Sequence, residues 1–336
     1  MKLQKAFQLN IKQSISLILL TLCIPLQAQE IPIKIQESVE LSKTVPIADV
    51  HMHIVDRSAA FHKAQMDRNN VKWGGGVGPT GKNPPSTKEI QSVLGNRYFL
   101  GLGQTEFTQV FFDVGAEGLK NKNNRSFSDL FKVADSQLAS KYAYGFGEIH
   151  IDNSNSAPSF RFARKITLDN PVLRTMYEIA NKHSSFVQLH MEADDVNIVA
   201  LKRYLVEFPN VSTIISHGLP YGKQTLIRDL LEKHPNIYFE LSRKGAVLNS
   251  KEAGQAFSTR NGVKIIWLKT LELYPDRFMI GSDTHDPDES KYDEVMQEFR
   301  NGLFPYLKPE TLKKVAYLNA VRVFRLVESS KLNSNP

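Results

Sequence analysis

The sequence predicts an α/β fold, a (β/α)₈ barrel that forms one domain over residues 47–330. Short β-branched or apolar runs alternate with amphipathic helical stretches, which is typical of repeated β-α units around a parallel sheet. Eight such units over about 280 residues fit a barrel. Side chains able to do chemistry fall at the ends of several runs, which also favours the barrel over the alternative, a doubly wound open sheet.

Eight runs are predicted to be the strands of this barrel. They begin near Ile47, Lys72, Arg97, Tyr142, Phe186, Ser212, Ile237 and Arg277. The segment Thr80–Asn124, around the second and third strands, is interpreted as an insertion, and we expect Glu106–Asn124 to be irregular.

Helices are predicted between the strands, and several of their ends carry a physical signal. Asp169-Asn170-Pro171 places a capping side chain before a proline suited to a first helical turn. Asp194-Asp195 puts negative charge at a helix start, where the helix dipole favours it. The predicted helices are Ser58–Asn70, Ser86–Leu94, Ser126–Lys141, Asn170–His183, Asp194–Phe208, Lys223–His234, Val263–Tyr274, Glu289–Leu303 and Pro309–Leu326.

Residues 1–28 have the pattern of a secretory signal peptide. Three lysines precede the apolar run Ile15–Leu26, and Ala28 is a small residue at the expected cleavage point. The run is shorter than the roughly 20 apolar residues of a membrane-spanning helix, so we expect no stable membrane anchor. The sequence therefore predicts an exported protein, periplasmic or extracellular, with residues 29–46 as an extended lead-in.

Cysteine content and charge exclude several classes of function. Cys23 is the only cysteine, so the mature chain would have no disulfide, no thiol nucleophile and no cysteine-bound zinc. The formal charge of +7 falls to +4 without the three signal lysines, with 39 basic against 35 acidic residues. Because these charges are scattered, we expect a small-molecule substrate and not a nucleic acid. The sequence leaves a homo-oligomer open.

Six chemically capable side chains fall at predicted strand ends. His51 and His53 are two residues apart, so in a strand they project from the same face. The carboxyl ends of barrel strands meet at one mouth, where active sites are built. The other four are Glu148, His190, His217 and Asp283. Each alone has a structural explanation, but their recurrence at the ends of different strands favours one common site.

Three imidazoles and a carboxylate suit a metal that does catalysis. Zinc bound in this way lowers the pKa of its water to near 7. In this interpretation Asp283 is both a metal ligand and the general base that accepts a proton from the water. His217 is the second catalytic residue and stabilises or protonates the developing oxyanion. Zinc is the default for such a nitrogen-rich shell, with manganese and iron as alternatives.

The ordered motifs resemble the amidohydrolase superfamily of metal-dependent TIM-barrel enzymes, in the amidohydrolase-related branch that includes lactonases and non-oxidative decarboxylases. The matching motifs are Asp49-Val50-His51-Met52-His53, Gln188-Leu189-His190, Ile215-Ser216-His217-Gly218, Pro235–Ser242, Ile280–Thr284 and Asn319–Phe324. The resemblance implies that His51, His53, His190 and Asp283 are metal ligands and that His217 lies beside the substrate.

The chain departs from the family at the fourth strand. Binuclear members often carry a bridging carboxylated lysine there, but no lysine occurs from Ala143 to Ile151. Glu148 occupies this region, and some relatives use a glutamate as ligand or bridge. We therefore expect one metal ion, with two as the alternative and Glu148 as a further candidate ligand.

The resulting hypothesis is a metal-dependent hydrolase acting on a lactone, ester or amide. The same ligands would serve a non-oxidative decarboxylase of an aromatic or enoic acid, and a non-catalytic exported ligand-binding barrel is the third hypothesis. Arg161 and Arg164 follow the fourth strand, and Arg243 follows the seventh. Because these loops open onto the mouth, the three arginines are candidates for binding a substrate carboxylate.

Overall fold

Parallel strands form a closed ring in the computed structural model, which describes residues 32–157, 159–242, 257–259, 262–284 and 289–327. All described residues belong to the unit that begins at Pro32. The strands of the ring are β1 (Ile47–Asp49), β2 (Val71–Gly75), β3 (Tyr98–Phe99), β4 (Gly101–Gly103), β5 (Gly145–His150), β6 (Phe186–His190), β7 (Ser212–Ile215), β8 (Ile237–Glu240) and β11 (Phe278–Met279).

The ring closes at two places where the regular ladder is interrupted. The strands pair in the orders β1-β2-β3 and β4-β5-β6-β7-β8-β11. Leu100 separates β3, which pairs with β2, from β4, which pairs with β5, so one predicted strand is split into two. A parallel bridge from Asp49 to Ile280 joins the other ends. The (β/α)₈ barrel is therefore confirmed, and the open sheet is wrong.

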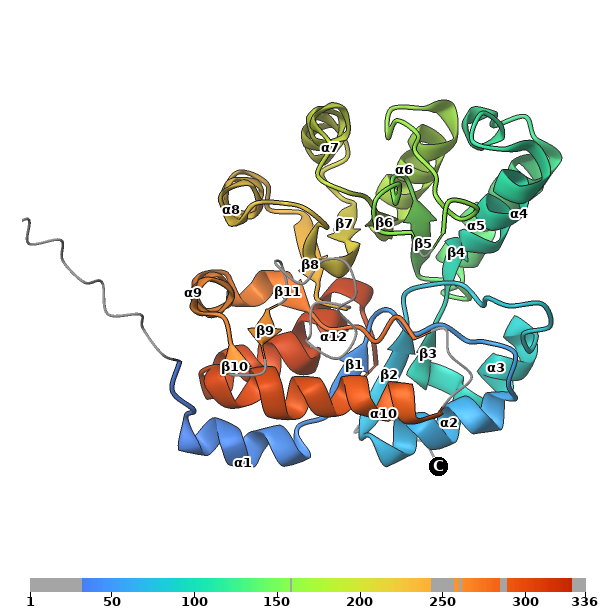
Figure 1. Cartoon of the computed structure of the whole chain (residues 1–336). Coiled ribbons are helices and arrows are strands. Elements are labelled where there is room, and N and C mark those ends of the chain that lie inside the picture. Colours follow the sequence, from blue (N-terminus) through green and yellow to red (C-terminus); the bar gives the residue numbers. More distant parts are fainter. Residues whose placement is uncertain (1–31, 158, 243–256, 260–261, 285–288, 328–336) are drawn as a thin grey trace, which may run out of the picture. The chain divides into compact units, whose positions relative to one another are not determined.

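The helices lie outside the ring of strands (Figure 1). They are α2 (Ala59–Arg68), α3 (Thr87–Leu94), α4 (Gln104–Val114), α5 (Arg125–Ala139), α6 (Pro171–His183), α7 (Asp195–Glu207), α8 (Gln224–Lys233), α9 (Ile265–Leu273) and α10 (Glu289–Glu298). The expected caps are present: the Asn170 side chain accepts from the amides of Val172 and Leu173, and that of Asp194 accepts from Asn197.

Helices also occur in the lead-in 29–46, which was expected to be extended, and in Glu106–Asn124, which was expected to be irregular. The lead-in contains α1 (Gln36–Thr44), and the Ser38 hydroxyl donates to the Leu307 carbonyl at 2.6 Å. The insertion contains α4, because Phe107 and Val110, one turn apart, are buried against the neighbouring helix. A short antiparallel pair, β9 (Ser258–Thr259) and β10 (Gly262–Val263), was not predicted. The predicted signal peptide 1–28 and Arg243 lie outside the described residues.

The last helical segment of the described residues plugs the barrel. The predicted last helix is built from α11 (Pro309–Lys313), a π-helical turn over Lys314–Leu318 and α12 (Asn319–Phe324). The Phe324 ring lies 4.6 Å from that of Phe99 and 4.7 Å from that of Phe186, between centroids, inside the ring of strands. Apolar side chains thus fill the amino-terminal half of the barrel, and polar side chains further along the same strands face the mouth.

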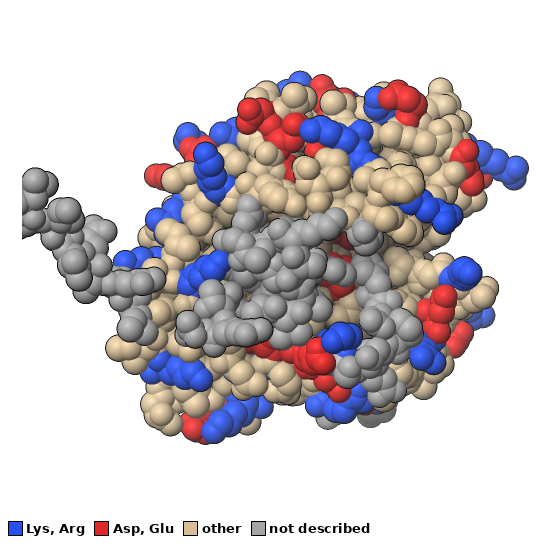
Figure 2. Space-filling model, viewed as in Figure 1, with Lys and Arg blue, Asp and Glu red and all other residues tan. Residues whose placement is uncertain are grey.

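Charged side chains of both signs are scattered over one face of the molecule. On the face shown in Figure 2, lysine and arginine side chains lie among aspartate and glutamate side chains. Among the described residues no helix has both the length and the apolar character needed to cross a bilayer.

Candidate metal centre

His51 and His53 lie just beyond β1, in a segment held from both sides. The Val50 amide donates to the Ile280 carbonyl and the Met52 amide to the Gly75 carbonyl, each at 3.1 Å. These bonds continue the ladder past the strand end. Both histidines are buried, and their ring centroids are 5.0 Å apart.

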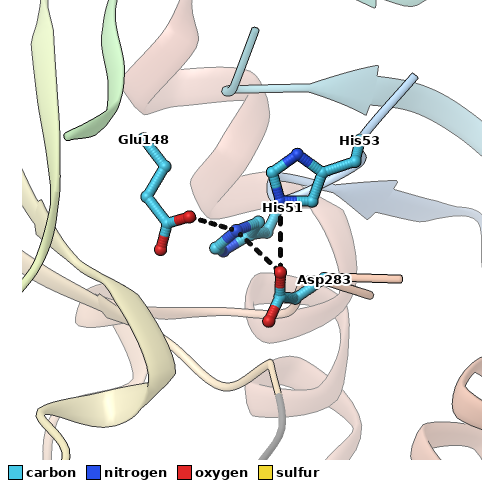
Figure 3. Close-up of side chains that lie close together, drawn as sticks. All are labelled: His51, His53, Glu148 and Asp283. Carbon is cyan, nitrogen blue, oxygen red and sulfur yellow. Dashed lines mark hydrogen bonds and ion pairs between the residues drawn. The ribbon is translucent and has the colours of Figure 1, made fainter. Parts of the chain in front are cut away.

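Four buried side chains converge at the mouth of the barrel: His51, His53, Glu148 and Asp283 (Figure 3). His51 Nε2 lies 3.2 Å from Glu148 Oε2 and 3.3 Å from Asp283 Oδ1, and His53 Nε2 lies 3.1 Å from the same Asp283 oxygen. One donor atom from each of the four lies within 4.8 Å of the others. The barrel thus brings together residues from β5 and from the segments beyond β1 and β11.

Glu240 orients His51. Its Oε1 lies 2.9 Å from His51 Nδ1, and the same carboxylate accepts from the His217 amide and from the Ser242 amide and hydroxyl. A carboxylate that accepts from Nδ1 leaves Nε2 of the neutral imidazole as an acceptor or metal donor. His51 Nε2 is buried and faces carboxylate oxygens of Glu148 and Asp283, but within the described part of the chain neither contact has the geometry of a hydrogen bond.

A second group of donors shares Glu148 with the first. Glu148 Oε1 lies 3.0 Å from His190 Nδ1, and its Oε2 lies 3.5 Å from His150 Nε2. His150 and His190 stack with ring centroids 4.7 Å apart. His190 therefore groups with His150 and Glu148, whereas His51, His53 and Asp283 group with Glu148.

His217 stands at the edge of both groups. Its Nε2 lies 3.0 Å from His190 Nδ1 and 3.3 Å from Glu148 Oε1, and its Nδ1 lies 2.8 Å from the Ser242 hydroxyl. His217 and Asp283 both adopt left-handed backbone conformations, with φ of 56° and 48°. Such conformations are uncommon for residues other than glycine and cluster at functional sites.

The buried charges at the site support one another. Burial disfavours a charged imidazole at His51, yet the carboxylates around it, Glu148 first, raise its pKa well above the usual value. Burial also disfavours the Glu148 carboxylate, but the imidazoles around it, His51 first, hold its pKa well below the usual range. Burial lowers the pKa of His150 and of His190. The site therefore combines an ionised Glu148 with two imidazoles that favour the neutral form.

These donors fit a divalent transition metal ion. Neighbouring ligands on a tetrahedral ion with bonds of about 2.1 Å stand about 3.4 Å apart. The contacts of 3.1–3.3 Å among His51, His53, Glu148 and Asp283 match this spacing. A dication would also bind the buried His51 Nε2 and neutralise the charge of the buried carboxylates.

The candidate substrate arginines differ in environment. Arg161 is exposed, and its guanidinium lies 5.8 Å from the Phe112 ring centroid. Arg164 is only 6% exposed, and its Nε and Nη1 make no hydrogen bond to any described residue.

Sequence reasoning missed two residues of the site. His150 follows Glu148 by two positions on β5, the spacing that singled out His51 and His53. Glu240 is a fully buried acid in the otherwise apolar run Ile237-Tyr238-Phe239-Glu240-Leu241. A buried acid in such a strand needs a partner, and that signal was available in the sequence.

Comparison with known proteins gives one family and several similar structures. The family model described as "Amidohydrolase" matches residues 150–326, more than half of the chain. No curated protein sequence matches the chain.

Three solved structures share the fold at low sequence identity. A probable 2-pyrone-4,6-dicarboxylic acid hydrolase from Acinetobacter baumannii has a TM-score of 0.54 and 14% identity, over 83% of this chain and 99% of that one. The dihydroorotase of Saccharomyces cerevisiae has a TM-score of 0.51 and 14% identity, over 85% of each chain. An uncharacterized TIM-barrel protein from Bordetella bronchiseptica has a TM-score of 0.50 and 12% identity, over 80% of this chain and 82% of that one.

Proposed function

Because this chain belongs to the amidohydrolase family, we propose that it is a metal-dependent hydrolase that cleaves a small lactone, ester or amide. The observation that carries the proposal is the buried group formed by His51, His53, Glu148 and Asp283 at the mouth of the barrel. Such a group has the nitrogen and oxygen donors of a catalytic metal site.

The four residues of this group would hold the metal, with Glu240 fixing the ring of His51. A bound dication supplies Lewis acidity toward a carbonyl oxygen and lowers the pKa of a bound water. Zinc is the default identity, and manganese and iron are the alternatives.

Asp283 is the general base in this proposal. Its Oδ1 faces both metal-binding imidazoles, while its Oδ2 lies 3.8 Å from His217 Nδ1. One oxygen can thus bind metal while the other accepts the proton of the attacking water. His217 supplies hydrogen-bonding and proton-donating capacity at the substrate oxygen.

One ion is the default, and two ions sharing Glu148 are the alternative. The shared carboxylate directs Oε2 toward His51 and Oε1 toward His190. Elemental analysis of a His150→Ala variant separates the two cases. With one ion the metal content stays near one per chain, and with two it falls.

The test of the function is a screen of the zinc-loaded protein against lactones, esters and amides, with release of carbon dioxide from aryl carboxylic acids measured in parallel. We expect hydrolysis that disappears in the His51→Ala/His53→Ala double variant together with the metal. Carbon dioxide release without hydrolysis would establish a decarboxylase instead. Tight ligand binding without any turnover would favour a non-catalytic barrel.

We also propose that the protein is exported and that residues 1–28 are removed, on the strength of the lysines, apolar run and Ala28 noted above. Mass spectrometry of the protein recovered from cells that secrete it should find a chain beginning at Gln29. An intact chain beginning at Met1 in the cell interior would contradict export.

A further inference from the structure

Arg164 is fixed at the mouth of the barrel by its own loop. The chain leaves β5 at His150 and doubles back, so that the Ile166 amide donates to the Ile151 carbonyl at 2.9 Å. The Arg164 amide donates to Asn153 Oδ1 at 2.8 Å, and the Asn153 amide donates to the Arg164 carbonyl at 3.1 Å. Arg164 thus lies opposite Asn153, three residues beyond His150.

The guanidinium of Arg164 is buried without an anionic partner. Its carbon Cζ lies 4.4 Å from the centroid of the Phe111 ring, which covers one face of the group. Its Nε and Nη1 are buried and donate to no described residue, and no carboxylate in the described ranges forms an ion pair with it. Buried charges in proteins are ordinarily paired and hydrogen-bonded. The Arg164 guanidinium therefore retains donors for an anion that is not part of the described chain.

Arg164 is charged, and its loop reaches the metal-binding residues. Burial lowers the pKa of Arg164 to about 10, so the guanidinium remains protonated at neutral pH. In the same loop the Ser156 hydroxyl lies 3.3 Å from His190 Nε2, and Asn153, which accepts from the Arg164 amide, lies three residues beyond His150. Arg164 therefore belongs to a loop that borders the site.

The neighbouring wall is aromatic. Phe112 and Phe162 make an edge-on contact with ring centroids 5.7 Å apart, and both are partly exposed. Phe111, which covers Arg164, contacts Phe112 with ring centroids 5.6 Å apart, so the apolar surface continues from Arg164 along α4 to the loop after β5. An apolar body carrying one negative group would find both kinds of contact here.

Building on the proposed hydrolysis, we propose that Arg164 binds a carboxylate of the substrate, so that the substrate class is a carboxylate-bearing lactone, ester or amide. The planar guanidinium offers two parallel donors to a carboxylate, a geometry that lysine does not reproduce. Arg164 is accordingly a specificity-determining residue.

The test is the binding of benzoate and of its neutral analogue benzamide to the zinc-loaded full chain, measured by calorimetry. We expect benzoate to bind more tightly than benzamide, and Arg164→Gln to weaken benzoate binding by about tenfold or more, as loss of a charge-assisted contact does. Arg164→Lys should recover only part of the loss. Arg203→Gln is the matched control. Arg203 lies on the outer helix α7 and pairs with Asp169 at the surface, so this variant removes an equal charge and should leave benzoate binding unchanged.

Two results would overturn the assignment: equal binding of benzoate and benzamide, or benzoate binding that Arg164→Gln leaves unchanged while removal of zinc abolishes it. The second result would mean that the metal alone holds the carboxylate. Circular dichroism shows whether Arg164→Gln is folded. If it is not, the comparison is made with Arg164→Lys.

Benzoate binding through Arg164 without any hydrolysis would refute the proposed function and leave this assignment standing. Equal hydrolysis of neutral and carboxylate substrates, unaffected by Arg164→Gln, would support the proposed function and refute the assignment of Arg164.

Discussion

At the scale of single residues, the site depends on one buried carboxylate outside the proposed ligand set. Glu240 accepts hydrogen bonds from the segments beyond β1, β7 and β8 and so fixes His51 and His217 relative to each other. This arrangement resembles the carboxylate-histidine pairs that orient ligands in zinc enzymes.

Replacing Glu240 should therefore weaken metal binding although Glu240 is not among the proposed ligands. Glu240→Gln removes the charge that orients the His51 proton, and we expect about 10- to 100-fold lower zinc affinity. Competition with a chromophoric chelator measures the effect. Asp229→Asn, which removes a surface carboxylate paired with Lys202 and Lys233, is the matched control, and equal affinities in the two variants would contradict the role of Glu240.

Residue types and spacing were enough to predict most of the site. His51, His53, Asp283 and Glu148 were all selected from the sequence, and the structure brings them together. The sequence did not specify which donors share one group, because that depends on how β5 projects Glu148 between His51 and His190. Local spacing contains no information about such distances between strands.

At the scale of elements, α12 closes the amino-terminal end of the barrel. Phe324 packs between Phe99 and Phe186, residues of strands on opposite sides of the break at Leu100. Truncation at this position leaves a cavity that the surrounding strands cannot readily fill.

We expect Phe324→Ala to lower the free energy of unfolding by about 3–5 kcal/mol. Chemical denaturation of the two proteins measures the difference. The same truncation at Phe160, which is 94% exposed, should cost less than about 0.5 kcal/mol. Similar losses for both variants would show that α12 does not plug the barrel.

His62 on helix α2 makes the stability of the protein depend on pH, independently of the metal site. His62 is 2% exposed, its Nε2 accepts from the Val55 amide at 3.3 Å, and burial lowers its pKa. A lowered pKa means that the neutral form contributes its full stability above the unfolded value near 6.5, and that this contribution is lost as pH falls through the folded value.

His62→Gln should therefore flatten the loss of stability on acidification. As the pH falls below about 6.5, the wild type should lose more stability than the variant. Urea denaturation across this pH range tests the expectation. Parallel curves for the two proteins would mean that His62 is not held neutral by the fold.

Element boundaries were predicted well where a cap or proline marks them, as at Asn170 and Asp194. The predictions failed where an element is stabilised mainly by distant contacts. Helix α1 is tied to Leu307 by the Ser38 hydroxyl. Helix α4 is held by Phe107, whose ring centroid lies 5.4 Å from that of Phe127. Neither partner is near in sequence, so local pattern alone did not indicate a helix.

At the scale of the whole molecule, the barrel holds donors from positions 51 to 283 in one buried group. Apolar residues and α12 close the amino-terminal side, so that the polar inward side chains gather on the carboxyl-terminal side. The barrel was predictable because eight β-α repeats leave few other topologies. The split third strand was not, because it arises from pairing with two different neighbours at Leu100.

The central claim is that this group binds one catalytic metal ion. The most direct measurement is an anomalous-diffraction map of zinc-loaded crystals, collected on both sides of the zinc absorption edge. We expect a peak in contact with His51, His53, Glu148 and Asp283. A map of well-ordered side chains without a peak among these four residues, or with zinc bound only elsewhere, would contradict it.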